Sequence, residues 1–200
     1  MKNKLKEMLK AIIPCIEGPY LVADGCLLGI IREGDLLDFD DDIDLYLLPG
    51  SKINYDKLPD KYKYYKDYMC MKVYDGKDEI PSSNEWLRFV SFKRCCYQYL
   101  GYNRAEICQD VAKYYKYERI TRKYPSVWID IFSLVHDCRY NIYRIPFHWR
   151  GTEFYFTADE CDGVNNDTLG FDIKIPKNPK QVLERIYGSN WIVEDRDHQY

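Results

Sequence analysis

The chain has 200 residues, of which 46% are hydrophobic and 30% charged, a balance typical of a globular protein. Its 29 basic and 32 acidic side chains give a net charge of −3, which argues against nucleic acid as a partner. A chain of this length fills one core, so we expect a single domain over residues 1–200. No stretch approaches the ~20 apolar residues of a membrane span, and no signal peptide is recognised. We therefore expect a cytoplasmic protein, for which peripheral association with the inner face of a membrane stays open.

The cysteines do not indicate a disulfide scaffold or a zinc site. There are eight, with neither CxxC nor Cys/His zinc spacing. We interpret them as reduced thiols that pack as small hydrophobic side chains.

The predicted elements mix helices and strands over the whole length. The first half is expected to contain a helix, a buried strand, a helix and a second strand, over residues 2–14, 19–23, 26–32 and 43–48. The rest is expected to contain two strands, a helix, a strand and a helix, over residues 69–74, 87–93, 103–117, 126–134 and 179–187. A hairpin near Arg150 and a loop over residues 159–167 are also expected. This order predicts an α/β or α+β domain.

The most informative segment is the run of five aspartates within residues 38–44. A solvated acidic loop accounts for Asp38 to Asp41. It does not account for Asp42 and Asp44, because Asp44 lies at the start of an apolar run. Alternate residues of a strand share a face, so Asp42 and Asp44 are expected to point to one side while Ile43 and Leu45 enter the core. Paired carboxylates with hard oxygen atoms favour Mg²⁺ or Mn²⁺.

A further aspartate lies in a second apolar strand. Asp130 has only apolar neighbours within residues 127–132, so its carboxylate must be neutralised. A salt bridge to a lysine or arginine would achieve this. The alternative is a metal shared with Asp42 and Asp44, in which three carboxylates hold one or two ions that bridge donor phosphates.

Asp24, Gly25 and Cys26 are expected to form the turn between the first strand and the next helix. Glycine lets backbone N–H groups approach a phosphate there, and the helix N-terminus adds a favourable dipole. Further along the helix, Arg32 is either a phosphate clamp or an exposed arginine at the helix end.

Segments 24–35 and 40–44 closely resemble the signature of the LicD family, which includes bacterial phosphocholine transferases and the animal proteins fukutin and fukutin-related protein. Segment 127–132 resembles the later aspartate-bearing strand of that family. Segments 175–178 and 183–191 resemble its closing segment, so the match runs in the family's order.

The resemblance implies a nucleotidyltransferase-like mixed β-sheet flanked by helices. It also implies transfer of a phospho-alcohol, such as phosphocholine or ribitol phosphate, from a CDP-linked donor to a glycan or glycolipid, with release of CMP. Asp42, Asp44 and Asp130 match the family's catalytic metal-binding positions, and Gly25 and Cys26 stand at its phosphate-binding turn. Cys26 replaces the usual serine or threonine, so a hydroxyl contact to phosphate is lost and only the backbone N–H remains. Residues 38 and 39 replace the usual Pro-Trp pair, so substrate choice could differ.

Two other functions stay open on the sequence. A nucleotidyltransferase would use the same aspartates to transfer a nucleoside monophosphate from a triphosphate and release pyrophosphate. A non-catalytic scaffold would keep the fold only, although unused buried carboxylates would then lower stability. His136 and His148 are candidate helpers of the reaction, and a structural role is the alternative for each. Arg144, Arg150 and Lys177 are candidates for contact with donor or acceptor phosphates.

Overall fold

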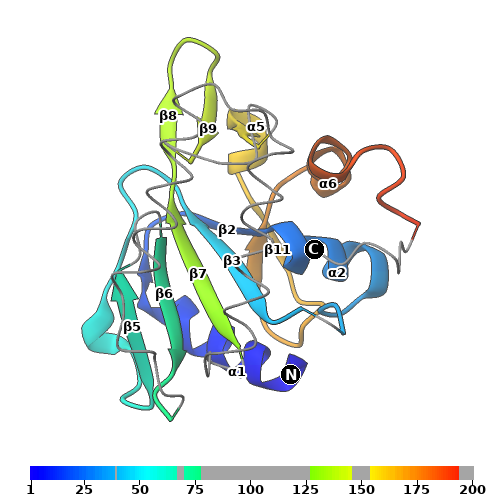
Figure 1. The fold of residues 1–200 in the computed structure, drawn as a ribbon. Coiled ribbons are helices and arrows are strands. Elements are labelled where there is room, and N and C mark those ends of the chain that lie inside the picture. The colour runs from blue at the N-terminus through cyan, green and yellow to red at the C-terminus, as the bar shows by residue number, and fades with distance from the viewer. Residues whose placement is uncertain (39, 67–69, 78–126, 146–153, 194–200) are drawn as a thin grey trace, which may run out of the picture.

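The computed structural model describes residues 1–38, 40–66, 70–77, 127–145 and 154–193 (Figure 1). The predicted strand over residues 87–93, the predicted helix over residues 103–117 and the hairpin near Arg150 lie outside the described residues.

A five-stranded mixed sheet in the order β2-β3-β7-β6-β5 forms the centre of the described structure. Across the sheet these strands cover Tyr20–Ala23, Asp42–Leu47, Trp128–Ser133, Cys70–Asp75 and Tyr62–Lys66. β3 and β7 run parallel, whereas the other neighbouring strands run antiparallel. With its flanking helices, this mixed sheet confirms the predicted α/β class (Figure 1).

Smaller strands pair beside the main sheet in three groups. All of these pairings are antiparallel. In the first group β1 (Ile16–Glu17) pairs with β4 (Lys52–Ile53), and in the second β9 (Ile142–Arg144) pairs with both β8 (Val135–Asp137) and β10 (Phe156–Thr157). In the third, β11 (Val164–Asn166) pairs with β12 (Ile173–Ile175).

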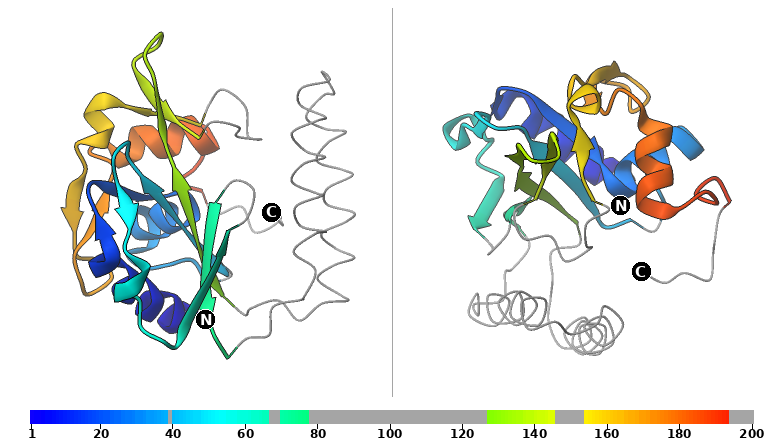
Figure 2. Two further views of the ribbon diagram at one scale, coloured as in Figure 1. Left: turned by 90° about the vertical axis from the view of Figure 1, so that its left-hand side faces the viewer. Right: turned by 90° about the horizontal axis from the view of Figure 1, so that it is seen from above.

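Among the described residues the helices are α1 (Lys2–Ile12), α2 (Asp24–Glu33), α5 (Ala158–Cys161) and α6 (Pro179–Tyr187), with single 3₁₀ turns η1 (Ile13–Cys15) and η2 (Tyr55–Lys57). Figure 2 shows α1 and α2 on the same side of the main sheet. The buried side chains of α1 recur at helical spacing, as the sequence predicted: Leu5, Met8, Leu9 and Ile12. No helix among the described residues is long and apolar enough to cross a membrane.

The predicted loop over residues 159–167 is wrong, because this segment contains α5 and β11. Thr157 starts α5 through a capping box: its hydroxyl accepts a hydrogen bond from the Glu160 amide, and the Glu160 carboxylate accepts one from the Thr157 amide. The loop prediction followed the Asp and Asn content and overlooked this local signal.

A buried ion pair joins α6 to the segment around α5. Glu160 is only 2% exposed, and its Oε2 lies 2.7 Å from Nη2 of Arg185. Arg185 also donates to the Tyr155 carbonyl at 3.0 Å and lies 4.3 Å from the centre of the Tyr155 ring. The guanidinium therefore offsets a carboxylate that would be costly to bury alone.

Substituting Arg185 by methionine should lower the free energy of unfolding by about 3 kcal/mol, because the buried Glu160 charge loses its partner. Urea denaturation measures this change. Lys177→Met is the matched control, since its pair with Asp159 is about half exposed and should be dispensable. Equal stability of the two variants would show that burial does not make the Arg185 pair important.

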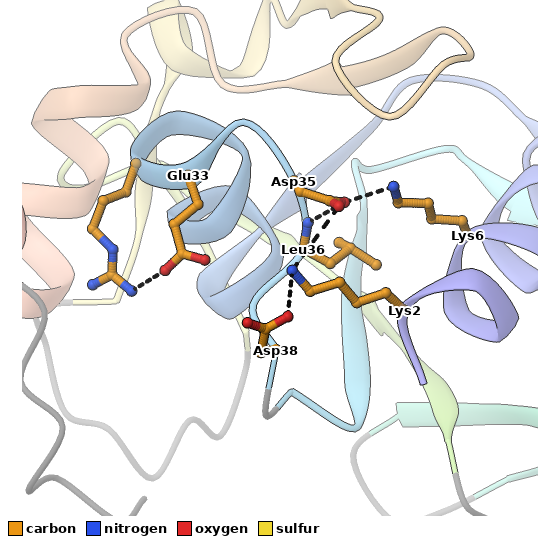
Figure 3. Close-up of polar contacts among 7 residues, drawn as sticks. Lys2, Lys6, Glu33, Asp35, Leu36 and Asp38 are labelled. Carbon is orange, nitrogen blue, oxygen red and sulfur yellow. Dashed lines mark hydrogen bonds and ion pairs between the residues drawn. The ribbon is translucent and has the colours of Figure 1, made fainter.

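The segment between α2 and β3 is tied to α1 by charged side chains (Figure 3). From α1, Lys6 Nζ lies 2.6 Å from Asp35 Oδ1, and Lys2 Nζ lies 2.8 Å from Asp38 Oδ1. The hydrogen bond from Lys6 helps to hold the pKa of Asp35 below its usual value. These pairs connect α1 to the segment that leads into the acidic run.

Candidate metal centre

Asp42, Asp44 and Asp130 lie side by side on β3 and β7. The two strands are parallel neighbours, and their register places Asp44 directly opposite Asp130. One carboxylate oxygen of each aspartate lies within 4.8 Å of those of the other two. This confirms that the three predicted carboxylates are adjacent, and three converging hard oxygen atoms suit a divalent cation such as Mg²⁺ or Mn²⁺.

The burial of β3 alternates over its first four residues as its sequence predicts, and its last three residues are all buried. Ile43 and Leu45 are fully buried, whereas the aspartates that alternate with them, Asp42 and Asp44, are only half-buried. The apolar face therefore packs into the core while the carboxylates lie on the opposite face. Asp130 is more buried than either, with 8% of its surface exposed.

Burial and mutual repulsion favour a proton on this acidic group. Burial, followed by the negative charges of Asp130 and Asp40, raises the pKa of Asp42 to about 8. Burial is also the largest cause of the raised pKa of Asp40. A bound divalent cation would offset the repulsion between these carboxylates and so take over the role of the proton on Asp42. The electrostatics of the cluster therefore fit a metal ion.

Lys72 is a residue of this site that the sequence reasoning missed. It lies on β6 directly opposite Asp130, and its Nζ is 2.5 Å from Oδ1 and 2.6 Å from Oδ2 of that carboxylate. Trp128 Nε1 also approaches Asp130 Oδ2, at 3.4 Å. The salt bridge considered as an alternative for Asp130 is thus present, beside the carboxylate cluster. The signal was a lysine between apolar residues of a predicted strand, which requires a counter-charge.

The predicted phosphate-binding turn is the first turn of α2, because β2 runs into this helix without a linking residue. Asp24 begins the helix with φ of 53° and is 3% exposed. Its carboxylate accepts a hydrogen bond from the hydroxyl of Tyr46, which is itself buried on β3. Asp24 therefore links the start of α2 to the strand that carries Asp42 and Asp44.

Gly25 and Cys26 follow at the N-terminus of α2, next to the acidic run. A Cβ atom at Gly25 would lie 2.5 Å from Asp40 Oδ2, so the glycine permits this carboxylate to approach the helix. The Cys26 side chain is 1% exposed, and burial raises the pKa of its thiol well above the usual value. Cys26 can therefore offer a ligand its backbone N–H, but not its side chain.

Gly25→Ala should lower the free energy of unfolding by about 1 kcal/mol or less, because the displaced group is the tip of a flexible side chain. The loss should disappear when Asp40→Ala makes room for the new methyl group. Urea denaturation of the single and double variants measures both changes. An equal loss in both backgrounds would show that Asp40 is not the reason for glycine at this position.

Arg32 lies in the last turn of α2, where its Nη2 is 2.8 Å from Glu33 Oε1. Seven residues of α-helix place it about 10 Å from Gly25 along the helix axis. The two residues could therefore contact only different parts of one ligand.

The other predicted helpers interact locally on other elements. His136 Nε2 lies 3.0 Å from Asn141 Oδ1, Arg144 pairs with Asp137 at 2.8 Å, and Lys177 pairs with Asp159. His148 and Arg150 lie outside the described residues.

A second acidic group, formed by Asp40, Asp41 and Asp42, overlaps the first through Asp42. Its oxygen atoms also lie within 4.8 Å of one another, but they come from consecutive residues at the end of a loop. Adjacency in the chain alone brings the carboxylates of consecutive residues together, whereas Asp130 is brought to Asp42 and Asp44 by the pairing of two strands. We therefore place the candidate metal centre at Asp42, Asp44 and Asp130.

Neither protein-family models nor curated proteins match this chain. Function is therefore proposed from the chemistry of the site, together with the short motifs that resemble the LicD family.

Proposed function

We propose that the chain is a metal-dependent phosphotransferase of the LicD type. It would move a phospho-alcohol from a CDP-linked donor to a hydroxyl of a glycan or glycolipid and release CMP. The observation that supports this most is the convergence of Asp42, Asp44 and Asp130 on two parallel strands. The start of α2 beside the acidic run, and the short motifs that resemble the family, add further support.

The donor set fits Mg²⁺ or Mn²⁺, because it consists of carboxylate oxygens from a partly buried face. Asp42, Asp44 and Asp130 would hold the ion. When bound, such an ion would neutralise charge on the donor diphosphate and on the departing CMP.

The protein groups around the centre would orient the donor and handle the proton. The N-terminal turn of α2 offers the backbone N–H groups of Gly25 and Cys26, together with the helix dipole, to phosphate oxygens. The acceptor oxygen would attack the phosphorus that bears the alcohol, and the bond from this phosphorus to the CMP oxygen would break. A carboxylate of the acidic run would accept the proton of the acceptor hydroxyl.

The proposal is tested by incubating the protein with Mg²⁺, which does not broaden phosphorus signals, a glycan acceptor and a series of CDP-alcohols, including CDP-choline and CDP-ribitol. Phosphorus NMR should show CMP release that depends on both the metal and the acceptor. The same assay with nucleoside triphosphates should show no pyrophosphate. Pyrophosphate from a triphosphate, without CMP from any CDP-alcohol, would instead identify a nucleotidyltransferase.

A further inference from the structure

Lys72 completes a row of charged residues across three neighbouring strands. The register of β3, β7 and β6 aligns Asp44, Asp130 and Lys72, so two carboxylates and one ammonium group lie along the same line. The ammonium contacts both oxygen atoms of Asp130, at 2.5 and 2.6 Å. A positive charge therefore already engages a carboxylate of the candidate metal centre.

The surroundings of Lys72 strengthen this contact. The side chains of Lys72 and Asp130 are 17% and 11% exposed, so water screens their attraction only in part. Lys72 Nζ also lies 5.2 Å from the centre of the Trp128 ring, within the range of a cation–π interaction.

A divalent ion that binds Asp130 would compete with this ammonium group. Both cations require the same oxygen atoms, and two positive charges on one carboxylate repel each other strongly in a partly buried site. The lysine must therefore release at least one oxygen atom. An ammonium on a flexible stem is also a good point-charge partner for phosphate, and a diphosphate at the centre would bring such oxygen atoms within its reach.

We propose that Lys72 neutralises Asp130 when no metal is bound. When a divalent ion binds Asp130, Lys72 releases this carboxylate and instead binds the diphosphate of the donor. This inference rests on the proposed function for the identity of the diphosphate. It assigns Lys72 two opposite effects: it weakens the binding of metal alone, and it strengthens the binding of diphosphate once the metal is present.

The first effect is measured by electron paramagnetic resonance of free Mn²⁺ during titration of the protein without nucleotide. Lys72→Met should bind Mn²⁺ about tenfold more tightly than the wild type, because the competitor is removed. Lys57→Met is the matched control, because it removes a positive charge from an exposed pair with Glu17 and should leave the affinity unchanged. Lys72→Gln, which keeps a hydrogen-bond donor without a charge, should behave like Lys72→Met and provides a second variant if one fails to fold.

The second effect is measured by calorimetric titration of CDP in saturating Mn²⁺. Lys72→Met should bind CDP about tenfold more weakly, whereas Lys72→Arg should keep most of the affinity and Lys57→Met all of it. Lys72 variants that bind Mn²⁺ no more tightly, or CDP as tightly as the wild type, would overturn the inference.

These outcomes separate the inference from the proposed function. A wild type that releases CMP from CDP-alcohols, with unchanged Mn²⁺ affinity in the Lys72 variants, would refute only the role of Lys72. The predicted Mn²⁺ and CDP effects without turnover of any CDP-alcohol would refute only the proposed reaction. A wild type that binds no Mn²⁺, alone or with CDP, would refute both.

Discussion

Asp44→Asn should reduce transfer from a CDP-alcohol by at least about a thousandfold, equivalent to roughly 4 kcal/mol of transition-state stabilisation. The amide keeps the size of the carboxylate but lacks its charge, and Asp44 lies directly opposite Asp130 at the centre of the site. The variant should also lose the rise in melting temperature that Mn²⁺ and CDP together give the wild type.

Asp56→Asn is the matched control for Asp44→Asn, because it makes the same chemical change at an exposed residue of η2. It should retain wild-type activity and the full response to Mn²⁺ and CDP. Activity of Asp44→Asn within tenfold of the wild type would show that this carboxylate does not hold the metal.

Without divalent cations, the protein should become less stable as the pH rises from about 4 to about 8. The pKa of Asp42 is raised in the folded state from 3.8 to about 8, so across this window the folded protein holds a proton that the unfolded chain has released. Loss of the Asp42 proton therefore destabilises the folded state, and the free energy of unfolding is expected to fall by an amount on the order of 3–5 kcal/mol. Urea denaturation in EDTA at several pH values measures it.

Mn²⁺ should reverse this trend, because the ion binds the deprotonated carboxylates and its stabilising effect should grow with pH. Asp42→Asn, which cannot titrate at this position, should flatten the metal-free profile between pH 5 and 8. A wild type with equal stability at pH 5.5 and 8 in EDTA would contradict the repulsive cluster described here.

The sequence predicted the carboxylates of the centre because their signal is local. Asp42 and Asp44 alternate with fully buried apolar residues, which fixes the face on which both lie. Asp130 interrupts an apolar strand, so its charge required a partner. The metal alternative for Asp130 placed its strand beside Asp42 and Asp44, and the register of β3 and β7 shows that the two strands are neighbours.

Lys72 could not be placed from the sequence, because its contact with Asp130 depends on the pairing of β6 with β7. The two residues are 58 positions apart, and strand register over such a separation follows from the packing of the whole sheet. The contact between Asp24 on α2 and Tyr46 on β3 is also non-local, since the two residues are 22 positions apart in the chain. By contrast, α5 had a visible local signal in its capping box, which the acidic composition of the segment obscured.

Anomalous diffraction from crystals of the wild-type protein soaked with Mn²⁺ and CDP would locate the bound metal. We expect a manganese peak bounded by the carboxylates of Asp42, Asp44 and Asp130, with diphosphate oxygen atoms completing its coordination. A crystal that binds Mn²⁺ elsewhere, and leaves these carboxylates without it at saturating concentrations, would contradict the metal centre and the reaction proposed from it.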